Sequence, residues 1–317
     1  MSATEQQPST ADSDAVSIYE VSLRDGLQNE KGVIPTEQKL VLFRALADAG
    51  LRRIELTSFV SPKWVPQLAD AKELLAAVDA GPGMTLSALV PNAKGLERAL
   101  GTGLHEIAVF LSASETHNKK NVNKTIDKTL HVFEEIVPPA LEAGLRVRAY
   151  VSTVWGCPYE GPVDPARAIA IGQQLVELGC YQISFGDTIG VGTPSQTRDI
   201  VERALDALAP EQVALHLHDT RGTALANIVT ALDMGIRQFD ASVGGLGGCP
   251  YAPGAAGNVA TEDLLYMLDG MGMKTGVDLN KLIEAGHVAE RVVGRPLPGK
   301  VHKAGPFKRR GGVESAD

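Results

Sequence analysis

The chain of 317 residues has few of the features that mark disulfide-bonded, membrane or nucleic-acid-binding proteins. Its three cysteines, Cys157, Cys180 and Cys249, include no Cys-x-x-Cys pair, so neither a disulfide framework nor a paired-cysteine metal site is expected. A reducing compartment, the cytoplasm, fits this usage best. No run approaches the roughly 18 apolar residues of a membrane-spanning helix. The 30 Lys and Arg against 38 Asp and Glu give a net charge of -8, which offers no large electrostatic footprint for nucleic acid.

The composition is that of a globular protein, with 44% hydrophobic and 21% charged residues. Residues 1–16 contain no Lys or Arg and no apolar core, so we expect a disordered arm there and not a leader peptide. Residues 296–317 end in a Gly- and charge-rich stretch and are predicted to form a flexible tail. No linker divides residues 17–295, which we expect to form one domain.

Short apolar or β-branched runs alternate with helical patterns along most of the chain. The expected strands cover residues 17–23, 53–57, 85–90, 106–111, 146–152, 182–185, 213–218 and 238–243. Helical spacing covers residues 36–49, 125–143, 164–178 and 193–208, and again 278–293. Eight such units close a barrel, and no Gly-x-Gly-x-x-Gly motif follows the first run. The pattern therefore predicts an α/β fold, a (β/α)8 TIM barrel with a short helical C-terminal extension, in preference to a doubly wound sheet.

Polar residues stand where the expected strands end, which is where such barrels bind their ligands. His216 and His218 lie two residues apart on one strand, so both side chains point to the same face. If that face is the barrel interior, both imidazoles can bind one metal ion, with Asp25 adding a carboxylate and Asn258 an amide oxygen. Such ligands suit Mg, Mn or Zn. A single His-x-His is otherwise two ordinary strand histidines.

Three more charged residues occupy comparable positions. Glu55 lies within an apolar run and needs a partner if it points into the barrel; Arg24 on the neighbouring strand is one candidate. That pair would fix the guanidinium for binding a substrate oxygen. The alternatives are a solvated carboxylate for Glu55 and a surface ion pair between Arg24 and Asp25. Asp187 ends the sixth strand in the same way, unless it caps a turn.

The loop at residues 244–251 holds four glycines and Cys249. A glycine-rich backbone after the last barrel strand is mobile or approaches a ligand closely, and its thiol can act as acid, base or nucleophile. The alternative is a buried small hydrophobic side chain, the interpretation that we prefer for Cys180 and Cys157.

Six separated segments carry a family resemblance. They are RDGLQNE at 24–30, TSFVSPKWVP at 57–66, GCPYEG at 156–161, GDTIGVGTP at 186–194, HLHDT at 216–220 and GLGGCPY at 245–251. Over about residues 18–293 the chain resembles the hydroxymethylglutaryl-CoA lyase family. The resemblance implies a metal-dependent barrel enzyme that cleaves 3-hydroxy-3-methylglutaryl-CoA to acetoacetate and acetyl-CoA, the last step of leucine breakdown.

The resemblance also implies roles for single residues. The divalent metal, Mg or Mn before Zn, would be held by Asp25, His216, His218 and Asn258, and CoA would be present only as part of the substrate. The other implied site residues are Arg24 against the enolate oxygen, Cys249 as proton donor or gate, Glu55 and Asp187 as supporting or proton-relay groups, and Lys31 and Arg148 near the CoA phosphates. His216 or Asp25 would be the base. A homodimer or higher homo-oligomer is the family expectation.

Three alternatives to this activity stay open at this point. Leu23, Gly244 and residues 221–223 depart from the family pattern, which leaves room for a lyase of a longer, terpenoid-derived 3-hydroxyglutaryl-CoA. A Claisen-condensing synthase shares the Arg-Asp-Gly and His-x-His motifs, but it lacks the Gly-Gly-Cys-Pro-Tyr loop. A non-catalytic metal-binding barrel has no need for acid, base and ligand residues together.

Overall fold

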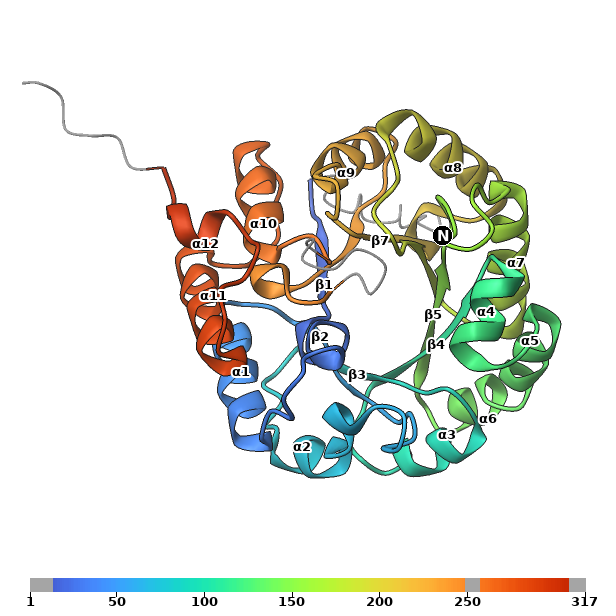
Figure 1. Ribbon diagram of the computed structural model, residues 1–317, viewed down its shortest axis with the longest axis horizontal. Coiled ribbons are helices and arrows are strands. Elements are labelled where there is room, and N and C mark those ends of the chain that lie inside the picture. Colours follow the sequence, from blue (N-terminus) through green and yellow to red (C-terminus); the bar gives the residue numbers. More distant parts are fainter. Residues whose placement is uncertain (1–13, 249–256, 308–317) are drawn as a thin grey trace, which may run out of the picture.

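The computed structural model describes residues 14–248 and 257–307. Within them, eight parallel strands form a closed barrel, in which β1 pairs with β8 (Figure 1). The strands are β1 (Ser17–Glu20), β2 (Arg53–Ser58), β3 (Thr85–Leu89), β4 (Glu106–Ser112), β5 (Arg146–Ser152), β6 (Gln182–Asp187), β7 (Val213–Leu217) and β8 (Gln238–Ala241). The predicted (β/α)8 barrel is confirmed.

Helices form a ring outside the barrel (Figure 1). They are α1 (Thr36–Asp48), α2 (Ala71–Ala77), α3 (Ala93–Ala99), α4 (Glu115–Val122), α5 (Ile126–Glu134), α6 (Val137–Glu142), α7 (Pro165–Leu178), α8 (Pro194–Ala207), α9 (Ala224–Asp233), α10 (Thr261–Gly270), α11 (Leu279–Val293) and α12 (Val301–Ala304). Short turns of 3₁₀ helix lie at η2 (Pro66–Leu68), η3 (Pro210–Gln212) and η4 (Val243–Gly245). None of the helices in the described ranges is both long and apolar enough to cross a membrane.

The side chains of each strand alternate between the two sides of the barrel wall. In β5, Val147, Ala149 and Val151 belong to the main apolar core, whereas Arg148 makes polar contacts inside the barrel. The core therefore supports the wall from the outside. The interior holds polar side chains beside a small apolar cluster of Leu89, Ala108, Phe110 and Tyr150, and the site lies there.

Most predicted elements differ from the structure by one or two residues at their ends, and two differ by more. The single helix expected at 125–143 is divided into α5 and α6, because Pro138 and Pro139 have no backbone N–H and fit only the first turn of a new helix. The first strand ends at Glu20, and the residues that follow form a π-helical turn, η1 (Ser22–Gly26).

Both ends of the described chain pack more closely than the expected arm and tail. The backbone N–H of Val16 donates to the Lys274 carbonyl at 2.9 Å. In the expected tail, Leu297 and His302 are buried, and α12 lies beside α11 (Figure 1). Average composition does not reveal such contacts, because they involve single side chains and backbone groups within otherwise polar segments. Residues 1–13 and 308–317 lie outside the described ranges.

Candidate active site

Arg24 and Asp25 lie on the π-helical turn η1, directly after β1. Such turns are rare and are frequent at functional sites. Gly26 packs so closely against the segment after β8 that a Cβ there would lie 2.9 Å from the Leu246 Cβ. The Arg-Asp-Gly sequence thus places two ionisable side chains next to a residue whose lack of a side chain lets the turn approach its neighbour.

Asp25, His216 and His218 bring three metal-ligand atoms together. These atoms all lie within 4.8 Å of one another. The two histidine Nε2 atoms are 3.3 Å apart, and His216 Nε2 lies 3.9 Å from Asp25 Oδ2. Two facing ring nitrogens can share only one proton, whereas a divalent cation between them would accept both lone pairs. The donor set therefore fits the metal site predicted from the sequence.

The state of His218 suits a metal ligand. Burial lowers the pKa of His218 to about 4, with the nearby His216 adding to the effect, so the ring is neutral near pH 7. Its Nδ1 is buried and has no hydrogen-bond partner within the described residues. No described group therefore fixes the tautomer of this ring, so its proton can lie on Nδ1 when Nε2 binds a cation.

Asn258 touches this cluster, but through its nitrogen. Its Nδ2 donates to Asp25 Oδ2 at 2.8 Å and to the Leu246 carbonyl at 3.1 Å. A half-turn of the amide would bring the oxygen to the same place. Burial raises the pKa of Asp25, but Arg24 and the histidines outweigh it and hold that pKa well below its ordinary value. Asp25 is therefore ionised.

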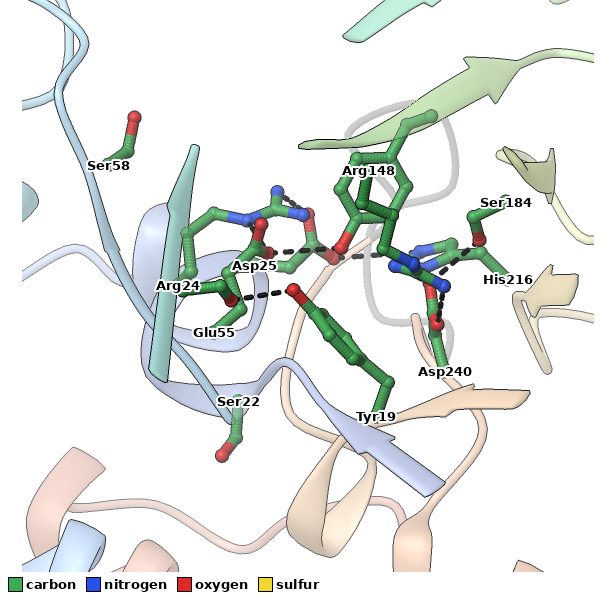
Figure 2. Close-up of polar contacts among 12 residues, drawn as sticks. Tyr19, Ser22, Arg24, Asp25, Glu55, Ser58, Arg148, Ser184, His216 and Asp240 are labelled. Carbon is green, nitrogen blue, oxygen red and sulfur yellow. Dashed lines mark hydrogen bonds and ion pairs between the residues drawn. The ribbon is translucent and has the colours of Figure 1, made fainter. Parts of the chain in front are cut away.

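The Arg24 guanidinium is held from two sides. Its Nε donates to Glu55 Oε2 at 2.5 Å, and its Nη1 donates to Asp25 Oδ1 at 2.5 Å (Figure 2). The Tyr150 hydroxyl donates to the same Glu55 oxygen at 3.2 Å. The pairing of Glu55 with Arg24 that we expected is therefore present. Within residues 14–248 and 257–307 nothing accepts a hydrogen bond from Nη2, and Arg24 lines the cavity described next, so this nitrogen is available to a ligand.

Arg24, Asp25, His216 and His218 all line a cavity of about 690 Å³. The cavity continues to the loop after β2, where the Trp64 side chain is exposed, and to lysines around the end of α4. Its volume is within the range of sites for small molecules and cofactors.

Two predicted catalytic residues cannot be placed in the cavity. Asp187 does not line it: its carboxylate accepts the backbone N–H groups of Val191 and Gly192 at 3.0 and 2.8 Å. Burial raises its pKa, although these hydrogen bonds lower it. This geometry is that of the turn cap considered as the alternative. Cys249 lies outside the described residues.

The two residues expected near CoA phosphates also differ from that expectation. Arg148 is fully buried, and its guanidinium donates to both carboxylate oxygens of Asp240, at 3.1 and 2.5 Å, and to Gln182 at 2.9 Å. A phosphate cannot reach it there, so this assignment is corrected. Lys31 is exposed and is not among the residues that line the cavity.

Sequence reasoning missed Asp240, which contacts His216. A signal was present, because a carboxylate between Phe239 and Ala241 in a buried strand needs a partner.

The comparisons with known proteins agree with this site. A family model described as HMGL-like matches residues 15–289. The chain belongs to this family. It is 51% identical over 289 residues to the mitochondrial hydroxymethylglutaryl-CoA lyase of Bos taurus, covering 91% of this chain and 89% of the relative. It is 52% identical over 285 residues to the hydroxymethylglutaryl-CoA lyase YngG of Bacillus subtilis, covering 90% and 95%.

Solved structures give the same result. The crystal structure of the Bacillus subtilis HMG-CoA lyase matches with a TM-score of 0.90 at 50% identity, covering 92% of this chain and 98% of the other. An HMG-CoA lyase from Acinetobacter baumannii, in complex with coenzyme A and 3-methylmalate, also has a TM-score of 0.90, at 38% identity, covering 96% and 99%. The carboxyl transferase domain of Rhizobium etli pyruvate carboxylase, at 17% identity and a TM-score of 0.69, covers 95% of this chain and 50% of the other, and shares the fold alone.

Proposed function

We propose that this protein is a divalent-metal-dependent hydroxymethylglutaryl-CoA lyase, which cleaves 3-hydroxy-3-methylglutaryl-CoA to acetoacetate and acetyl-CoA. The observation that carries the proposal is the cluster of Asp25, His216 and His218 beside an oriented Arg24. The cluster lies in a chain that is about half identical to named hydroxymethylglutaryl-CoA lyases over nine-tenths of the chain's length. CoA enters only as part of the substrate.

The reaction sets clear chemical demands. A base takes the proton from the tertiary hydroxyl, the carbon–carbon bond breaks, and its electron pair becomes the enolate of the acetyl-CoA thioester. A proton must then return to that carbon. The site therefore needs a proton acceptor, a proton donor and a fixed positive charge near the enolate oxygen.

The residues of the cluster divide these tasks. Asp25, His216 and His218 would hold the metal, with the Asn258 amide oxygen as a further ligand. When bound, a divalent ion lowers the pKa of the substrate hydroxyl and orients the substrate. His216 or Asp25 serves as the base, and only with a lone pair that the metal does not hold. Mg or Mn suits the oxygen ligands better than Zn, which remains the third choice.

The groups around the cluster supply the remaining functions. Arg24 offers Nη2 to the enolate oxygen while Glu55 and Asp25 keep its plane fixed, so no reorganisation is needed as charge develops. Cys249 returns the proton or gates the site, as the family resemblance implies.

The cellular location and the assembly of the enzyme are part of this proposal. Some carry the name mitochondrial and others cytoplasmic, and for this chain we favour the cytoplasm and a homodimer or higher homo-oligomer.

The test is release of acetyl-CoA and acetoacetate from 3-hydroxy-3-methylglutaryl-CoA by the full chain. We expect no cleavage after EDTA treatment and recovery with Mg²⁺ or Mn²⁺, but no recovery in His218→Ala. The matched control is His131→Ala, which removes an exposed histidine from α5. If the folded, metal-loaded protein leaves this substrate intact, the proposal fails, and a longer-chain substrate and then acetyl-CoA condensation with a 2-oxo acid would be assayed.

A further inference from the structure

The two histidines of the cluster differ in what stands behind them. His216 Nδ1 lies 3.1 Å from Asp240 Oδ2, on the neighbouring strand β8 (Figure 2). His218 Nδ1 has no hydrogen-bond partner within the described ranges. Among the residues that the structure describes, a buried carboxylate therefore orients the His216 ring and none orients the His218 ring.

Asp240 is itself immobilised. The Arg148 guanidinium donates to both of its oxygens, and the Ser184 hydroxyl donates to Oδ2 at 2.9 Å (Figure 2). A carboxylate in such a fork is ionised and can only accept hydrogen bonds. The hydrogen between Asp240 and His216 must then come from the imidazole.

We propose that Asp240 is a positioning residue that holds His216 in the tautomer with its proton on Nδ1, so that the Nε2 lone pair points toward His218. The other groups facing His216 cannot do this. The Tyr150 ring meets it edge-on at a centroid distance of 5.9 Å, and Asp25 and His218 approach Nε2. The inference rests on the proposed function, because it concerns the metal site on which cleavage would depend.

The two histidine rings therefore differ in how they are prepared to bind a cation. His216 is preset as a nitrogen ligand by a carboxylate that never touches the substrate cavity. His218 must shift its proton to an Nδ1 without an acceptor when its Nε2 binds a cation. Loss of the carboxylate should therefore act on His216 directly, and on His218 only through the proton that the two facing Nε2 atoms share.

The test is Asp240→Asn, because an amide can donate to Nδ1 and so favour the wrong tautomer. We expect Mn²⁺ titrated into the metal-free protein to bind about 10- to 100-fold more weakly than in the wild type. In spectra of ¹⁵N-histidine-labelled protein, the His216 proton should move from Nδ1 to Nε2. His216→Ala assigns the signal among the seven histidines. Asp199→Asn, which removes a carboxylate from an exposed pair on α8, is the matched control and should bind Mn²⁺ as the wild type does.

If Asp240→Asn does not fold, the double variant Arg148→Met/Asp240→Asn removes the carboxylate without leaving Arg148 unpaired. Mn²⁺ affinity within twofold of the wild type would overturn the proposal. Weaker binding with the Nδ1 proton retained would overturn it as well, since the effect would then be structural only. Neither measurement uses an acyl-CoA, so a failure of the lyase assay would be distinguishable from a failure of this inference.

Discussion

Two polar clusters lie inside the same barrel, and they differ in how completely their atoms are paired. The inner cluster consists of Tyr19, Glu106, Arg148, Gln182 and Asp240. Each of its buried side-chain nitrogens and oxygens has a hydrogen-bond partner. The Arg148 guanidinium is also stacked 4.1 Å from the centroid of the Tyr19 ring.

The mouth cluster consists of Arg24, Asp25, His216, His218 and Asn258. The His218 Nδ1 and the Arg24 Nη2 have no hydrogen-bond partner within the described chain, and two ring nitrogens, on His216 and His218, face each other. We therefore assign the fully paired charges to stability and the incompletely paired ones to chemistry, with Asp240 connecting the two clusters through its contact with His216. A closed network stabilises the fold, whereas an incomplete one is a site for a ligand.

The largest effect is expected from opening the inner cluster. Arg148→Met leaves the buried Asp240 carboxylate without its cation, which should lower the free energy of unfolding by about 3–5 kcal/mol. Urea denaturation of the metal-free protein measures it. Arg203→Met, at a half-exposed position of α8, is the control. A loss below about 1 kcal/mol, the level of an exposed ion pair, would show that the network is not structural.

The next effect should come from the mouth cluster and should appear in the rate. Arg24→Lys keeps the charge but cannot hold Glu55, Asp25 and a substrate oxygen together, so kcat should fall by about 10²- to 10³-fold. Initial rates at saturating substrate measure this effect. Arg44→Lys, on the exposed side of α1, should leave kcat unchanged. A wild-type kcat in Arg24→Lys would show that catalysis does not depend on the fixed guanidinium.

The sequence predicted these two clusters unequally. Strand periodicity was enough for the barrel and for the pairing of His216 with His218, because a period of two puts both on one face. It did not show that Arg24 and Asp25 lie on a π-helical turn, since that shape depends on close packing against the segment after β8.

The position of Arg148 could not be predicted from the sequence, for a different reason. An arginine in an apolar strand can reach solvent or lie in the interior, and only the partner on β8 decides between them. Asp187 shows the same limit, because its carboxylate could meet the cavity or the backbone of its own loop.

Another buried carboxylate, that of Glu262, pairs with no Lys or Arg among the described residues, and its basic neighbour is the His302 ring, 4.0 Å away. Glu262 accepts the Gly244 N–H with both oxygens, at 2.9 and 2.8 Å, and burial raises the pKa of Glu262 to about 8. The folded state therefore keeps a proton that the unfolded state has lost above its ordinary pKa of 4.5. Between these two values stability should fall as pH rises.

Glu262→Gln should remove this dependence. The wild type should lose up to about 1.4 kcal/mol per pH unit relative to the variant. Urea midpoints across that pH window measure the difference. Glu284→Gln, on the exposed side of α11, should behave as the wild type does. Parallel pH profiles for wild type and Glu262→Gln would mean that the carboxylate is ionised in the folded protein.

The smallest effect is expected at the surface. Asp199 and Arg203 form an i,i+4 ion pair at 2.9 Å on α8, and each side chain is about half exposed. Asp199→Asn should change the free energy of unfolding by no more than about 0.5 kcal/mol, because solvent screens such pairs. A loss comparable to that of Arg148→Met would contradict the distinction between closed interior networks and surface pairs.

The most direct test of the central claim is Mn²⁺ binding to the metal-free protein, measured by calorimetry on the wild type and on Asp25→Asn/His218→Ala. The mouth cluster should bind a single Mn²⁺ in the wild type and none in the double variant. Thermal unfolding curves of both proteins serve as the control that each is folded. Equal binding by the two proteins would show that the ion is held elsewhere and would contradict the account.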